Sequence, residues 1–143
     1  MQLRIKLRSV AVFLVLAALT LSLGFLGACS TAVPPMITQH PVAPIVKSEG
    51  MYLIASRHRD TIKESMTRAG LKPVDSPTGS YSLEVNVGKG RGSGDCGTVS
   101  NVNYILTSAG GRVMVIKGRG PTGSCDDNIF AAMSQKLASV TTE

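Results

Sequence analysis

The chain has 143 residues, a net charge of +6 and an aromatic content of only 4 %. This length supports one domain with one modest hydrophobic core. Three bases, Arg4, Lys6 and Arg8, lie in the first ten residues, and the rest of the chain has 12 basic against 9 acidic residues. A net charge of +3 is only mildly basic, so we expect no nucleic-acid partner.

The amino-terminal segment has the organisation of a secretory signal. The three bases precede an apolar run from Val10 to Leu26, and small residues follow the run. About 17 residues is the short limit for crossing a bilayer, so an uncleaved membrane anchor is an alternative. A plain soluble secreted protein is the other alternative.

The four residues Leu26-Gly27-Ala28-Cys29, directly after the apolar run, resemble the lipobox of bacterial lipoprotein precursors. The resemblance implies that residues 1–28 are a cleaved signal peptide. It also implies that Cys29 carries a fatty acid such as palmitate and becomes the first mature residue. Ser30 replaces the aspartate that usually retains Gram-negative lipoproteins in the inner membrane. The resemblance therefore implies an anchor in the outer membrane, with the protein facing the periplasm.

Residues 29–49 are predicted to be the lipidated cysteine and an extended tether. Four prolines between Pro34 and Pro44 fix φ, and the segment has no helical or strand period. Extended residues of about 3.1 Å each would let a domain stand on the order of 60 Å from the membrane. We therefore expect one folded domain over residues 50–143.

The domain is predicted to be α+β, with a mostly antiparallel sheet in the order β-α-β-β-β-α. Tyr81 to Val87 alternates between apolar and polar residues, which is typical of a half-buried strand. The predicted elements are a strand at 51–55, a helix at 57–69, a brief extended piece at 71–74, strands at 81–87, 99–107 and 112–118, and a helix at 126–140. The last helix is expected to use Ser124 or Asp126 as its N-cap. Packing both helices on one face of the sheet is the economical arrangement.

Three cysteines leave one unpaired in a secreted protein. If Cys29 carries lipid, Cys96 and Cys125 remain as a pair in an oxidising compartment, and we predict a structural disulfide between them. A redox pair and a pair of metal ligands are the alternatives. The chain has no C-x-x-C motif, and neither cysteine has a histidine near it in the sequence.

The tetrapeptide KGRG occurs twice, at 89–92 and at 117–120. Each copy is expected to end a strand and to lead through a glycine-containing loop to a cysteine. In a three-stranded meander the first and third strands are parallel, so their carboxyl ends lie at the same edge. This geometry brings Cys96 and Cys125 together. Crowding at this corner predicts glycines with positive φ.

The same geometry predicts a basic rim made of Lys89, Arg91, Lys117 and Arg119. Such a rim could bind an anionic envelope partner, namely a lipid phosphate, an anionic glycan or an acidic protein surface. The alternative is a solvated edge that limits aggregation.

No motif in the sequence indicates catalysis. The G-x-G-x-x-G pattern at 92–97 precedes a predicted strand instead of a helix, which argues against a dinucleotide site. His40 and His58 are isolated, and two histidines cannot form a three-ligand zinc site. Asp126 and Asp127 at a helix start are expected to serve as capping residues. We predict no catalytic, cofactor-binding or metal-ligating residue and no cofactor.

The chain resembles small lipoproteins of envelope assembly and transport in three features. These are a proline-bearing segment after the lipobox, a predicted helix that ends in Ala69-Gly70-Leu71, and a predicted strand that opens with Tyr81–Val85. The resemblance implies a non-enzymatic accessory domain that binds an envelope protein complex or an anionic envelope ligand. The alternative is a periplasmic hydrolase or redox enzyme with an unfamiliar site.

Overall fold

The computed structural model describes residues 32–143. The predicted signal peptide and Cys29 lie outside the described residues. The elements, in chain order, are β1 Val33–Gln39, β2 Ile45–Val46, β3 Met51–Ala55, α2 Arg59–Arg68, β4 Pro73–Val74, β5 Tyr81–Val87, β6 Arg91–Gly94, β7 Gly97–Ser108, β8 Gly111–Pro121, α3 Ile129–Ala138 and β9 Thr141–Thr142. Neither of these helices has the length and hydrophobicity to cross a membrane.

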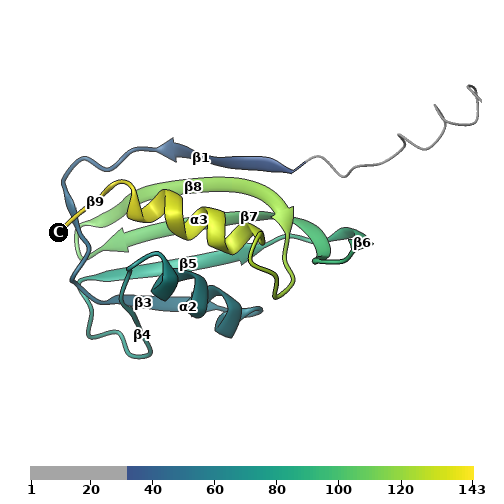
Figure 1. The fold of residues 1–143 in the computed structure, drawn as a ribbon. Helices are drawn as coiled ribbons and strands as arrows, with labels where there is room; N and C mark the ends of the chain where they lie inside the picture. Colours follow the sequence, from purple (N-terminus) through teal and green to yellow (C-terminus); the bar gives the residue numbers. More distant parts are fainter. Residues whose placement is uncertain (1–31) are drawn as a thin grey trace, which may run out of the picture. The chain divides into compact units, whose positions relative to one another are not determined.

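The main sheet has the strand order β1-β8-β7-β5-β3-β4, and β6 pairs with β7 at one end (Figure 1). The prediction of an α+β domain with a mostly antiparallel sheet is confirmed, because β1, β8, β7 and β5 pair antiparallel. The strand order differs in detail from the predicted one. Strands β4 and β5 both pair parallel with β3, since helix α2 returns the chain to the starting end of β3.

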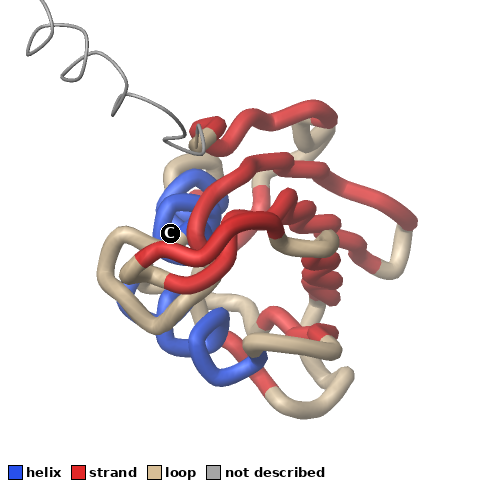
Figure 2. Tube along the Cα trace, turned by 90° about the vertical axis from the view of Figure 1, so that its right-hand side faces the viewer, coloured by secondary structure: helices blue, strands red, loops and turns tan. Residues whose placement is uncertain are grey.

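Both helices cover the same face of the sheet, as predicted (Figures 1 and 2). One hydrophobic cluster fills the space between them and the sheet, and it includes Leu83 from β5, Met66 from α2 and Phe130 from α3. Tyr104 of β7 is buried in this layer, where its hydroxyl oxygen lies 3.4 Å from Ser134 Oγ. Burial raises the pKa of the Tyr104 hydroxyl, so the group stays neutral.

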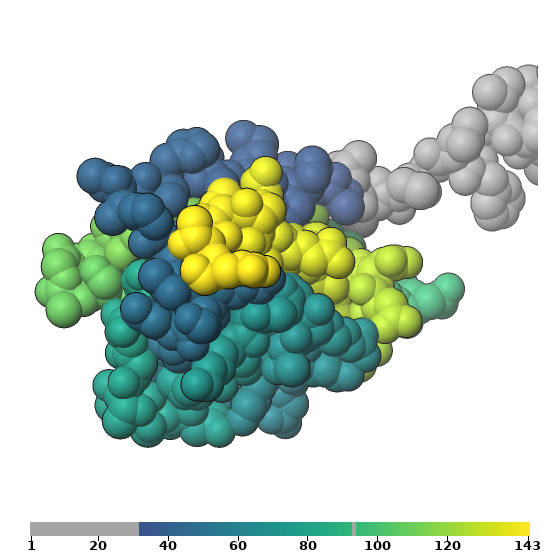
Figure 3. All heavy atoms as spheres, turned by 60° about the vertical axis from the view of Figure 1, so that its left-hand side comes forward, coloured from purple at the N-terminus to yellow at the C-terminus, as the bar shows by residue number. Residues whose placement is uncertain are grey.

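The tether predicted for residues 29–49 is wrong over most of its length. Strand β1 pairs antiparallel with β8, and β2 pairs parallel with β9 near the carboxyl end. Ile45 is 0 % exposed and belongs to the hydrophobic core. Figure 3 shows the yellow carboxyl-terminal segment lying against the blue strands that begin the described chain. The folded part therefore begins near Val33 instead of Gly50.

Two prolines hid strand β1 from the sequence pattern. Pro34 and Pro35 interrupt the alternation and cannot donate a ladder hydrogen bond. The strand tolerates them because β1 is the outer strand of the sheet, with β8 as its single neighbour. The pairing accommodates them through two register irregularities between Val33 and Gln39.

The N-cap predicted for the last helix is also wrong. Helix α3 begins at Ile129, and Asn128 is its N-cap, with the Asn128 side chain accepting a hydrogen bond from the Ala131 N–H at 2.9 Å. Ser124 and Asp126 precede the helix because the chain between β8 and α3 passes through the disulfide corner first.

Candidate functional site

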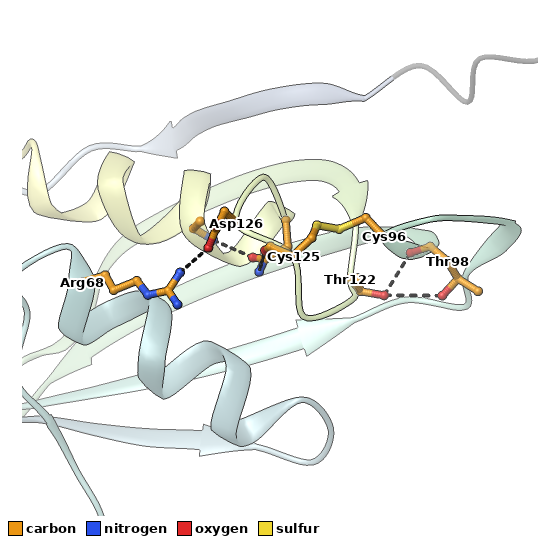
Figure 4. Close-up of a disulfide and its surroundings, with 8 residues drawn as sticks. Arg68, Cys96, Thr98, Thr122, Cys125 and Asp126 are labelled. Carbon is orange, nitrogen blue, oxygen red and sulfur yellow. Dashed lines mark hydrogen bonds and ion pairs between the residues drawn. A yellow bond between two sulfur atoms is a disulfide. The ribbon is translucent and has the colours of Figure 1, made fainter.

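The predicted disulfide between Cys96 and Cys125 is present, with 5.6 Å between the two Cα atoms. It joins the turn before β7 to the loop before α3 (Figure 4). The backbones meet at the same point, because the Gly123 N–H donates to the Cys96 carbonyl at 2.8 Å and the Thr122 N–H donates to the Thr98 carbonyl at 3.0 Å. The meander geometry inferred from the sequence therefore holds at this corner.

The two KGRG copies have different structural roles. The first lies in the connection to β6 and in β6 itself, where Gly92 has a φ of 73°, as crowding at a turn predicts. The second lies inside β8 and does not end the strand, so this part of the prediction is wrong. A Cβ at Gly118 would lie 3.1 Å from both Ile129 Cδ1 and Met133 Sδ, which shows that the glycine admits helix α3 close to the strand.

An ion pair holds the disulfide corner to helix α2. Arg68 contacts Asp126 at 2.7 Å (Figure 4). It also contacts Glu64 at 2.6 Å. The hydrogen bond to Asp126 is the main cause that raises the pKa of Arg68. The Asp126 side chain is 91 % exposed, so this ion pair joins helix α2 to the loop before α3 at the protein surface.

The face of the sheet opposite the helices, here called the open face, carries the four predicted rim residues. On β8, Met114 and Ile116 point into the core, so Lys117 and Arg119 project from the other side. Their partners across β7 are the neutral amides Asn103 and Asn101. The sequence placed these cations at strand ends. In the structure, Lys117 and Arg119 instead lie within β8, where both pair with residues of β7.

Two adjoining hollows on the open face bring the four cations together. One hollow of about 440 Å³ lies between β1 and β7, with Val33 and Met36 on one wall and Lys117 and Arg119 in its lining. The second, of about 250 Å³, is lined by Lys89, Arg91, Val99, Asn101 and Arg119. Arg119 and Asn101 belong to both hollows, so the cations form one continuous cluster.

The open face carries a fifth cation, Arg112, which the sequence pattern did not predict. Arg112 lines a further hollow of about 430 Å³, which it shares with Lys117. Strict alternation from Lys117 would place residue 112 on the core face. A bulge between the pairs Leu106–Met114 and Thr107–Arg112 inserts one residue in β8 and reverses the side on which Arg112 projects. A single-strand pattern gives no signal for such a bulge.

None of the ion pairs formed by described residues uses a cation of the open face. The four pairs join Arg59, Lys63 and Arg68 to carboxylates on the helix side and its adjacent loops. On the open face, Glu84 of β5 accepts a hydrogen bond from Asn86 Nδ2 at 2.9 Å. Glu84 is a carboxylate on this face, but none of the five basic side chains forms an ion pair with it or with another described residue.

The remaining candidates form no site. His58 is the N-cap of α2 in a left-handed conformation, with its ring 5.4 Å from the Phe130 ring, and His40 is exposed just after β1. The 92–97 glycine pattern lies in the β6–β7 hairpin, where no helix follows. Within residues 32–143, no three side chains of His, Cys, Asp and Glu gather in a way that could hold a metal ion.

No protein-family model matches the chain, and no curated protein matches it. Among solved structures, the PelC dodecamer from Paraburkholderia phytofirmans superposes with a TM-score of 0.52 at 15 % identity, covering 76 % of this chain and 98 % of PelC. A substituted form of the same PelC dodecamer gives a TM-score of 0.48 at 13 % identity, covering 76 % of this chain and 99 % of the other. At this identity the first likeness shows a shared fold.

Proposed function

We propose that this chain is an envelope lipoprotein anchored through Cys29, and that its domain is a non-enzymatic module that binds an anionic envelope ligand. The lipobox-like residues before Cys29 support the anchor. Ser30, which stands where an aspartate would retain the protein in the inner membrane, supports an outer-membrane location facing the periplasm. The cationic open face supports the binding role.

The carrying observation is the cluster of five unpaired cations on the side of the sheet that no helix covers. An antiparallel sheet commonly leaves one face in water, and such a face usually mixes charges of both signs. Here Lys89, Arg91, Arg112, Lys117 and Arg119 are accompanied by Asn101 and Asn103. Fixed positive charge attracts anions at long range, and the amides supply neutral hydrogen-bond donors and acceptors.

The binding role is tested with matched lysine variants of the protein. Lys89→Gln/Lys117→Gln removes two exposed charges from the open face, and Lys72→Gln/Lys136→Gln removes two exposed charges elsewhere. Titration calorimetry with polygalacturonate, a soluble polyanion, and with vesicles that contain phosphatidylglycerol should show weaker binding for the first variant alone. Equal binding of the two variants to both probes would refute the proposed role of this face.

The anchor is tested by metabolic labelling with a radioactive fatty acid. The parent chain should incorporate label and be cleaved before Cys29, whereas Cys29→Ser should remain an unlabelled precursor. Incorporation that survives the substitution would remove the lipoprotein proposal.

A hydrolase or redox enzyme is the competing class. A redox role requires the Cys96–Cys125 pair to cycle between the disulfide and two thiols. Thiol labelling of protein isolated from an oxidising compartment tests the redox alternative. We expect no label at either cysteine, and substantial labelling would favour the redox enzyme.

A further inference from the structure

The connection between the proposed anchor and the folded domain is shorter than the tether predicted from the sequence. Strand β1 begins at Val33, so only Ser30, Thr31 and Ala32 stand between Cys29 and the sheet. Four residue steps extend at most about 14 Å. A domain joined to an acylated Cys29 by this segment must stay beside the membrane surface.

The cations lie at the end of the sheet where β1 begins. Val33 pairs with Arg119, and Arg119 shares a hollow with Lys89 and Arg91 from the β6 region. Figure 1 shows β6 at the same end of the sheet as the start of β1. The residue closest to the anchor in the chain is thus a direct neighbour of the cationic cluster.

Exposed apolar side chains accompany these charges. Val33 is 43 % exposed and Met36 is 59 % exposed, and both line the hollow that contains Lys117 and Arg119. Apolar groups beside cations are the composition that binds at a membrane interface, where acyl chains and charged headgroups meet.

From this placement we propose that the anionic ligand of the open face is the lipid headgroup layer of the membrane that holds the anchor. This inference rests on the proposed lipoprotein function. Lys89, Arg91, Lys117 and Arg119 contact anionic headgroups, and Val33 and Met36 enter the outer part of the interface. Acylation and a basic patch then act together, as stable anchoring by lipid usually requires two signals.

The arrangement fixes an orientation for the domain. The open face turns toward the lipid, and the helix face turns away from it. The helix face suits the outward position because its charges are largely balanced: Arg68 pairs with Glu64 and Asp126, and Asp127 is exposed beside them. Helices α2 and α3 remain accessible to other envelope components.

The unacylated domain is suitable for a direct test. The buried hydrophobic cluster lies between Ile45 and Leu137, and the disulfide lies inside the same range. A fragment of residues 30–143 therefore contains the whole described core. Circular dichroism and the absence of free thiols verify its fold before binding is measured.

The test is co-sedimentation of this fragment with vesicles of pure phosphatidylcholine and of phosphatidylcholine with 30 % phosphatidylglycerol. We expect binding to the anionic vesicles alone, and weaker binding as the Debye length falls from about 10 Å in 0.1 M salt to about 3 Å in 1 M salt. Each base near an anionic surface strengthens binding about fivefold, so Arg91→Gln/Arg119→Gln should weaken it roughly 25-fold.

Arg112→Gln tests how the position of a cation on the open face affects binding. Arg112 lies seven residues from Arg119 along β8, on the order of 20 Å farther from the start of β1. As a member of the open-face cluster it should still weaken vesicle binding, but by less than the roughly fivefold expected for one base at the end where β1 begins. Lys72→Gln/Lys136→Gln, with the same charge change as the double arginine variant, should bind like the parent fragment. Lys89→Gln/Lys117→Gln gives a second open-face variant if the arginine variant does not fold.

Three outcomes overturn the inference and remain distinguishable from each other. Binding to polygalacturonate without binding to vesicles would assign the open face to an anionic polymer, and the proposed function would stand. Equal binding to neutral and anionic vesicles would leave the cations without a role. No binding to either polyanion or vesicle, in a correctly folded fragment, would remove the binding function as well.

Discussion

Replacing Cys96 and Cys125 by serine should strongly destabilise the described domain. The bridge closes a segment with a sequence separation of 29. In the chain-entropy model, a loop of this length restricts the unfolded chain by about 3.6 kcal/mol at 25 °C. For a domain of this size, about 4 °C of melting temperature corresponds to 1 kcal/mol, so the midpoint should fall by roughly 15 °C.

The structure also predicts a local effect of the bridge. Near it, the Gly123 N–H donates to the Cys96 carbonyl and the Thr122 N–H donates to the Thr98 carbonyl. Without the disulfide, these two hydrogen bonds must hold the loop before α3 by themselves. Their amide protons should exchange faster in the serine variant, while amides in the middle of β7, near Tyr104, stay protected against sub-global opening.

Thermal unfolding followed by circular dichroism measures the global effect, and hydrogen exchange measures the local one. The parent protein under reducing conditions should match the double serine variant. Ser124→Ala, which changes an exposed neighbour of the corner and keeps the bridge, should unfold like the parent. A loss below about 1 kcal/mol, with unchanged exchange at Gly123, would refute the entropic reasoning for this loop.

Three further substitutions test the packing that the structure adds to the sequence pattern, each by urea unfolding with the slope m compared between variants. Ile45→Ala should cost about 2–5 kcal/mol because the side chain is 0 % exposed, and a cost under 0.5 kcal/mol would return this segment to the role of a tether. Asn128→Ala should cost about 1 kcal/mol or more, and Asn128→Asp should recover only part of this loss, because it keeps an acceptor for the Ala131 N–H but removes the Nδ2–H that Asn128 donates to the Cys125 carbonyl; a loss below about 0.3 kcal/mol for Asn128→Ala would argue against the cap. Gly123→Ala should cost about 1–3 kcal/mol because the added Cβ would lie 2.5 Å from the Cys96 carbonyl oxygen, and a neutral effect would show that the corner relaxes freely.

The elements that the sequence predicted well are those in which one short segment contains its own signal. Tyr81–Val87 alternates over a full strand, and the structure forms β5 over the same residues. Met51–Ala55 is an apolar run, and it forms β3. The two helices have apolar positions at helical spacing, and both form, although their ends move inward by one to three residues. Such signals are local because each depends on the period of one element.

The candidate site could be predicted only in part. The repeated KGRG pointed to cations that the structure brings together, since one copy lies beside β7 and the other in β8. Arg112 escaped prediction because a bulge in the β7–β8 pairing decides the side on which it projects. A bulge is a property of two strands together, so no pattern in one strand reveals it.

By itself, the sequence determined the α+β class, the position of most strands and helices, and the pairing of Cys96 with Cys125, because periodicity and the direction of a meander follow from the order of residues. The tertiary structure alone decided that β1 belongs to the sheet. Its prolines remove the local signal, and the free energy that holds it comes from pairing with β8, which lies about 80 residues later in the chain. The same long-range pairing places Val33, close in the chain to the proposed anchor, beside Arg119 of the cationic cluster.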